Sequence, residues 1–161
     1  MHWQSSLTLL TILLGACLAH PSGAPAGSCE SEDPKHGVAP QGTQSPYAVQ
    51  VEPTVSTQGN PVSVTVYGNS PYRGLLLTAR DVYSSQIVHG AFTADGNTKT
   101  VDCAGGRANA ITHNSNSDKT QSTVHWTAPA GYTGRVYFSA TVVQDYGTYW
   151  KRVTSDAVTV Q

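Results

Sequence analysis

Residues 136–143, with the sequence Val136-Tyr137-Phe138-Ser139-Ala140-Thr141-Val142-Val143, contain the longest regular pattern in the chain. Apolar and polar residues alternate along the stretch. Alternate side chains of a β-strand point to opposite faces, so this pattern predicts a strand with one buried face. The position of this stretch near the C-terminal end makes the preceding segments its expected neighbours.

Shorter segments with the same character precede and follow this stretch. They lie at 47–51, 62–67, 124–126 and 158–160, while Leu75–Leu77 followed by 78–80 predicts a more central strand. The turn-forming residues between them are Asn60-Pro61, Asn69-Ser70-Pro71, Asp95-Gly96-Asn97 and Pro129-Ala130-Gly131. No helical periodicity is present. The sequence therefore predicts an all-β chain, most specifically an immunoglobulin or fibronectin-III-like antiparallel β-sandwich with Trp126 in its core.

The segment before the first predicted strand, residues 20–46, is rich in Pro, Gly and Ser and has no periodic pattern of apolar residues. We expect an irregular N-terminal segment there, with a flexible leader over residues 20–28.

Residues 1–19 contain an apolar run, Leu7–Leu14, followed by the small-residue stretch Ala16–Ala19. The run is shorter than the roughly 20 residues that cross a bilayer and matches the core of a signal peptide, about 7–15 residues. We therefore expect a signal peptide over residues 1–19 and a secreted, extracellular product with no integral membrane segment. The alternative is a bacterial lipobox, which Leu14-Gly15-Ala16-Cys17 resembles, but bacterial signals usually carry early Lys or Arg and none precedes this run.

The charge excludes one class of partner, and the cysteine content predicts one crosslink. Nine Lys and Arg stand against ten Asp and Glu, with a formal net charge of −1, so no nucleic-acid partner is expected. Loss of the signal would leave Cys29 and Cys103, and an isolated pair in an oxidising compartment predicts a disulfide. Two free thiols, or a crosslink between chains, are the alternatives. The disulfide would tie the irregular segment to the middle of the domain.

Four segments, in this order and spacing, resemble the reeler domain family, known from small insect defence proteins and from the N-terminal module of reelin. They are Cys29 with Pro34–Gly37, Gln41 and Ser45–Tyr47; Tyr72–Arg80; Cys103 with Asn109–His113 and Lys119; and Trp126–Pro129 with Val136–Val143 and Trp150. The family's methionine after the first cysteine is replaced here by Ser31-Glu32-Asp33. The resemblance implies a reeler-like β-sandwich domain over residues 29–161.

The resemblance also implies a function. Reeler relatives that are membrane ferric reductases or matrix proteins have further domains, whereas this sequence ends with the module, as the defence proteins do. It implies a secreted, non-catalytic innate-immune protein with antibacterial activity. The partners would be bacterial surface glycans or lipids: lipopolysaccharide, peptidoglycan or teichoic acid. The alternative is an extracellular matrix or adhesion module that binds host proteins or glycosaminoglycans.

The best binding candidate is the aromatic and basic group Tyr146, Tyr149, Trp150, Lys151 and Arg152. It reads as a hairpin turn between two late strands, at an end of the sandwich where such folds carry ligand loops. Exposed rings would offer flat faces to sugars, and the cations would meet phosphate groups. Ordinary cross-strand aromatic packing is the other interpretation of these rings, and the pattern slightly favours it.

Arg80 and His113 are further candidates. Arg80 would either contact a ligand or pair with a residue such as Asp81 or Asp102. His113 would either contact a ligand or order the polar loop that follows it through a hydrogen bond.

Catalytic motifs are absent from the sequence, which has no nucleophile elbow, phosphate loop or Cys-rich metal motif. We therefore expect no catalytic residue, no metal and no cofactor. A mature N-terminal His20 would be able to chelate copper, but the Pro- and Gly-rich residues after it are expected to be too flexible to hold a rigid site.

Overall fold

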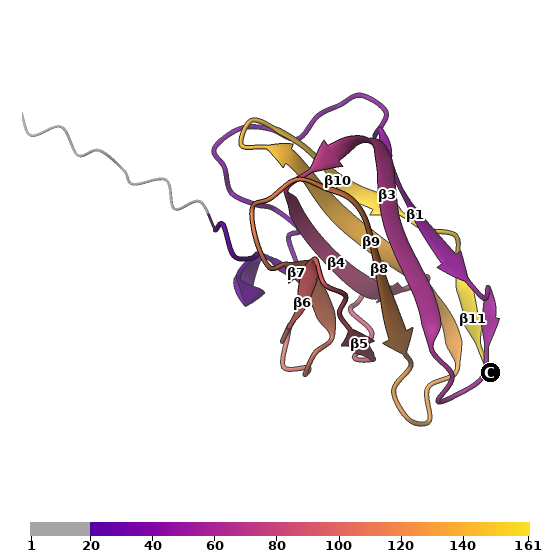
Figure 1. Cartoon of the computed structure of the whole chain (residues 1–161). Coiled ribbons are helices and arrows are strands. Elements are labelled where there is room, and N and C mark those ends of the chain that lie inside the picture. Colours follow the sequence, from indigo (N-terminus) through magenta and orange to yellow (C-terminus); the bar gives the residue numbers. More distant parts are fainter. Residues whose placement is uncertain (1–19) are drawn as a thin grey trace, which may run out of the picture.

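The structure, a computed structural model, describes residues 20–161; the predicted signal peptide and the alternative lipobox at Cys17 lie outside this range. Two β-sheets pack face to face (Figure 1). The four-stranded sheet has the order β1-β3-β8-β5. Its strands are β1 Tyr47–Glu52, β3 Val62–Tyr72, β8 Lys119–Thr127 and β5 Ala91–Thr93.

The second sheet has seven strands in the order β2-β11-β9-β4-β7-β6, with β10 paired to β9. Its strands are β2 Val55–Ser56, β11 Val158–Val160, β9 Gly134–Asp145, β4 Gly74–Asp81, β7 Ala110–His113, β6 Thr98–Val101 and β10 Thr148–Thr154. A short 3₁₀ helix, Ala26–Ser28, precedes all of the strands. The predicted all-β sandwich is confirmed, and the 136–143 stretch lies within its longest strand, β9.

Two details differ from the purely antiparallel prediction. Strands β2 and β11 pair in parallel. Residues Asn69-Ser70-Pro71, expected as a turn, instead belong to β3, where the register with β8 shifts between Tyr67 and Tyr72. Pro71 has no backbone N–H to donate, and the irregular pairing at this point removes the need for one.

The sheets share one apolar core built from their inward-facing side chains. Trp126 is fully buried there and packs edge to face on Phe138, with ring centroids 5.5 Å apart. Its predicted core position is confirmed. Inward-facing residues of β4 and β9, such as Leu77 and Val142, complete the core from the second sheet.

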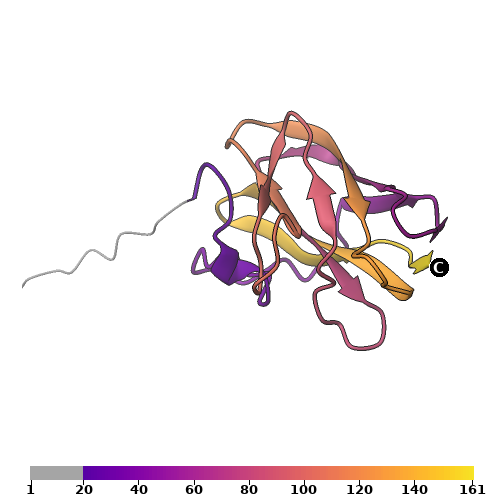
Figure 2. The same ribbon diagram turned by 90° about the horizontal axis from the view of Figure 1, so that it is seen from below.

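Strand β4 is buried on both faces, from Gly74 through Arg80. Leu75, Leu77 and Ala79 face the shared core, so Leu76, Thr78 and Arg80 face the outer side of the sheet. The outer side is covered by residues 20–36, which we call the cover segment. The two views show it in indigo along the outside of the sandwich beside β7 (Figures 1 and 2). The sandwich therefore carries a third layer over the middle of one sheet.

Candidate functional site: a pocket under the cover segment

The middle of the covered face is a row of three side chains on adjacent strands. Leu76 of β4 is in register with Thr141 of β9 on one side and with Thr112 of β7 on the other. Leu76 is 5% exposed although it does not belong to the shared core. An apolar side chain on the outer face needs its own cover, and the cover segment supplies it.

A disulfide and a buried ion pair attach the cover segment to the domain. Cys29 is bonded to Cys103, 74 residues further along the chain. Glu32 is 3% exposed, and its Oε1 lies 3.3 Å from Nε of Arg80. Thr141 adds a hydrogen bond from its Oγ1 to the Glu32 carbonyl oxygen, at 2.7 Å. The disulfide that the cysteine content predicted is present.

The beginning of the cover segment lies against β7. The Ala24 N–H donates to Thr112 Oγ1 at 2.7 Å, and Nε2 of His113 donates to the His20 carbonyl oxygen at 3.1 Å. Gly23 allows this approach: its φ of +122° favours glycine, and a Cβ there would lie 2.7 Å from the Thr112 methyl group. Residues 20–28, predicted as a flexible leader, therefore have defined partners in the structure.

His113 links three segments. Its Nδ1 accepts the backbone N–H of Leu75 at 3.1 Å while Nε2 holds His20. Burial lowers the pKa of His113; hydrogen bonding with the backbone of Leu75 and His20 opposes this, and the charges of Lys119 and Lys99 add to it. The neutral ring with a proton on Nε2 satisfies both contacts. The structure thus gives His113 a hydrogen-bonding role, directed at β4 and the cover segment.

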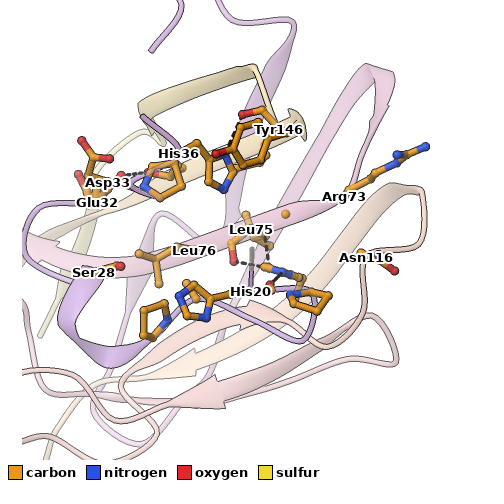
Figure 3. A pocket seen from close by; sticks show the side chains of 18 of the residues that line it. His20, Ser28, Glu32, Asp33, His36, Arg73, Leu75, Leu76, Asn116 and Tyr146 are labelled. Carbon is orange, nitrogen blue, oxygen red and sulfur yellow. Dashed lines mark hydrogen bonds between the residues drawn. The ribbon is translucent and has the colours of Figure 1, made fainter. Parts of the chain in front are cut away.

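Between the cover segment and the sheet lies a pocket of about 230 Å³ (Figure 3). Its floor includes Gly74, Leu76 and Val143 of the sheet. Its walls include three prolines of the cover segment: Pro21, Pro25 and Pro34. A concave, mainly apolar space with a few polar groups at its edge is the usual form of a small-molecule site.

His36 and Tyr146 stack at the edge of this pocket, as Figure 3 shows. Their rings are 4.7 Å apart with planes 12° from parallel, and Nδ1 of His36 donates to the Tyr146 carbonyl oxygen at 2.9 Å. This stack joins the cover segment to the β9–β10 hairpin. Tyr146 and His113 are the two predicted candidates that line the pocket.

The predicted aromatic group forms the expected hairpin, but most of its rings are not exposed. Tyr149 is 1% and Trp150 9% exposed, whereas Tyr146 is 46% exposed. Trp150 packs edge to face on Tyr47, at 5.5 Å. The expectation of exposed Tyr149 and Trp150 faces is therefore corrected in favour of aromatic packing, because both side chains fill space between the hairpin and its neighbours.

The three predicted basic candidates are engaged within the protein. Lys151 lies 3.3 Å from Asp33, and Arg152 lies 3.5 Å from Glu32. Arg80 pairs with Glu32 rather than with Asp81 or Asp102, which corrects the predicted partner. Asp81 follows Arg80 on the strand and so points to the opposite face. Asp102 instead accepts the Ala108 N–H at 2.7 Å.

A second, polar hollow lies on the outer face of the four-stranded sheet, far from the cover segment in the fold. It is lined by Gln50, Val51, Glu52, Ser63, Thr65, Tyr67 and Gln121. Strand register places Tyr67 beside Gln121 and Gln50 beside Thr65. Unlike the pocket under the cover segment, this hollow is lined mostly by polar side chains.

Sequence reasoning missed the pocket because Glu32 and Pro34 lie far from Leu76 in the chain. One signal was available. In a strand, three consecutive leucines place the Leu76 side chain on the other face of the sheet from Leu75 and Leu77. An apolar side chain on that outer face needs other residues to cover it. Nothing local identified residues 20–36 as that cover.

Two further findings about residues 20–161 concern membrane-spanning helices and metal-binding side chains. No helix there is both long and apolar enough to span a bilayer. No group of three or more His, Cys, Asp or Glu side chains there is arranged to hold a metal ion.

These features define a class: a β-sandwich whose irregular N-terminal segment is crosslinked across one sheet. The family model of the Reeler domain matches residues 27–161, so the chain belongs to the reeler family. The family resemblance of the sequence is thereby confirmed.

Curated relatives fall into two groups. "Putative defense protein 3" of Antheraea mylitta is 38% identical over 145 residues, covering 88% of this chain and 87% of that protein. Defense protein Hdd11 of Hyphantria cunea is 33% identical, covering 97% and 98%. Ferric-chelate reductase 1 of Mus musculus is 32% identical, but the chain spans only 27% of its length.

Solved structures agree on the fold. The human F-spondin reeler domain superposes with a TM-score of 0.60 at 23% identity, covering 77% of this chain and 94% of that one. This likeness concerns the fold alone.

Proposed function

We propose that this protein is a secreted defence protein that binds bacterial surface material without catalysis. The observation that carries the proposal is the apolar pocket between the cover segment and β4. A soluble domain rarely keeps an apolar space at its surface unless something binds there. The defence names of the relatives that match over most of their length favour a bacterial source for that ligand.

The charge distribution favours this function over glycosaminoglycan binding. An anionic polymer is attracted by a cluster of cations with no acidic neighbours. Arg73, Arg80, Lys151 and Arg152 each lie within ion-pair distance of an acidic residue. Lys119 is buried and donates to the Ser115 and Ser117 carbonyls. The other four cations lie on different segments of the chain: Lys35, Lys99, Arg107 and Arg135.

The test is retention of the purified mature protein on intact Gram-negative and Gram-positive bacteria, lipopolysaccharide and peptidoglycan, with immobilised heparin alongside. We expect retention on at least one bacterial material and none on heparin at physiological salt. Absence of binding to the cells, to lipopolysaccharide and to peptidoglycan would overturn the proposal. Binding to heparin alone would establish the matrix-type alternative.

Secretion is tested separately by expressing the whole chain in a eukaryotic secretory host. We expect to recover the protein from the medium, with a mass that corresponds to residues 20–161. A product retained in the cell with residues 1–19 intact would contradict the signal peptide.

A further inference from the structure

We propose that the pocket under the cover segment binds a single acyl chain of an amphiphile, whose polar head stays at the mouth. The bacterial origin of that amphiphile rests on the proposed function; the chemistry of the chain does not. Lipid A, lipoteichoic acid and free fatty acids all carry such a chain.

The first argument is the surface that a ligand would meet. Leu76 and Val143 offer branched apolar side chains from the sheet, and three proline rings face them from the cover segment. Proline rings are rigid, so this wall loses little conformational freedom when a ligand binds. Such a surface gains free energy by excluding water with hydrocarbon.

The second argument is that several of the polar groups around the pocket already have partners. Thr141 Oγ1 is bonded to the Glu32 carbonyl, and the Glu32 carboxylate lies between Arg80 and Arg152. Asp33 accepts the Lys35 N–H at 2.7 Å. A sugar buried here would lose its hydrogen bonds to water and would find few free groups to replace them, whereas an acyl chain loses none.

The third argument is size. A volume of about 230 Å³ is far more than one water needs but below the roughly 300–1,000 Å³ of sites for drug-sized ligands. The pocket therefore has room for one short acyl chain.

The mouth carries charge of both signs. Arg73, more than half exposed, lies 2.7 Å from Asp118, and Asp145 is also at the pocket. Figure 3 shows Arg73 and Asn116 to one side of the cavity, away from His36. A head group thus meets no uniform field, and we expect the chain rather than the head to determine affinity.

Titration calorimetry of the wild-type protein with hexanoate, octanoate, decanoate and dodecanoate tests this directly. Each methylene that becomes buried should tighten Kd roughly fourfold, until the pocket is full and the trend levels off. The heat-capacity change on binding should be negative. Kd values that do not depend on chain length, or no binding at all, would overturn the proposal.

Two substitutions fill the pocket from opposite sides: Val143→Phe on β9 and Ala24→Phe on the cover segment. Each should weaken decanoate binding at least tenfold. Val55→Phe is the matched control, since Val55 lies on β2 at the other edge of the sheet and is exposed. If the melting curve shows that Val143→Phe does not fold, Ala24→Phe and the chain-length series still test the acyl-chain proposal.

The source of the chain is distinguished by comparing lipopolysaccharide with the polysaccharide left after its lipid A is removed. We expect wild type to bind only the acylated form, and Ala24→Phe to lose that binding. Retention on bacteria that survives Ala24→Phe but is lost in Tyr67→Ala would overturn the acyl-chain proposal and leave the proposed function standing. Binding of decanoate without binding to any bacterial material would overturn the proposed function and leave the acyl-chain proposal standing.

Discussion

The carboxylate of Glu32 lies 3.3 Å from Nε of Arg80, and both side chains are buried although 48 residues separate them. Glu32 comes from the cover segment and Arg80 from the outer face of β4. Arg80 also donates from Nη2 to the Cys29 carbonyl at 2.7 Å, next to the disulfide. Ion pair and crosslink therefore hold the same short part of the chain.

We expect Glu32→Ala to lower the free energy of unfolding by about 3 kcal/mol, because it leaves the buried Arg80 charge with only Glu30 as a counter-ion, which is more distant, at 3.8 Å, and largely exposed. Chemical denaturation measures this. Asp118→Ala, which breaks the exposed Arg73 pair, is the control and should cost no more than about 1 kcal/mol. Equal losses in the two variants would mean that burial does not distinguish the pairs.

Replacing both cysteines, Cys29→Ser with Cys103→Ser, should destabilise the protein by about 4–5 kcal/mol, as expected when a loop of this length is no longer closed. The separation is 74 residues. We also expect faster hydrogen exchange over residues 29–46. An unchanged melting temperature would show that the bond does not stabilise the domain.

Gly23→Ala should loosen the cover segment locally. The new Cβ would lie 2.8 Å from the His113 carbonyl oxygen, in a backbone conformation that disfavours side chains, at a cost of about 1–3 kcal/mol. Hydrogen exchange should rise over residues 20–28 and stay unchanged in β3 and β8. Gly27→Ala, where no atom lies within 4 Å of the added Cβ, is the control.

Stability should depend on pH through His113. Burial lowers its pKa from the ordinary 6.5. The stabilisation by the neutral ring is thus fully present above about pH 6.5, and it is lost as the pH falls toward the folded-state pKa, since the unfolded chain binds the proton first.

Melting temperatures between pH 7.5 and pH 5 measure this effect. We expect the wild type to lose more stability over that range than His113→Gln, which has no proton to gain. The lowered pKa of Asp33 places its own effect below about pH 4, outside the window. Identical slopes for both proteins would contradict the role of His113.

The strands β1, β3, β4, β8, β9 and β11 could be predicted because their signals are local, whereas the short strands β2, β5, β6 and β7 had no such signal. Period-two alternation at 136–143 and 62–67, and turn residues such as Asp95-Gly96-Asn97, depend only on neighbours in the chain. Even the central position of β4 could be predicted, because a strand with both faces buried has no polar alternation.

The candidate site could be predicted only in part, because its contacts are long-range. The hairpin at Tyr146 was expected, but whether Tyr149 and Trp150 face solvent depends on Tyr47 and Val38, about a hundred residues earlier. The burial of Glu32 depends likewise on Arg80. Composition assigned residues 20–28 to a flexible leader, because Pro and Gly indicate irregular backbone without showing whether it packs.

The cover segment has one more consequence, for how such proteins diverge. It lies outside the core shared by the two sheets and is anchored at a few points, so substitutions in its prolines reshape the pocket while the sandwich keeps its packing. If the pocket binds a ligand as proposed, ligand preference and fold stability therefore depend on different parts of the chain. Exchanging residues within 20–36 would then change the preference of this protein while the two sheets keep their packing.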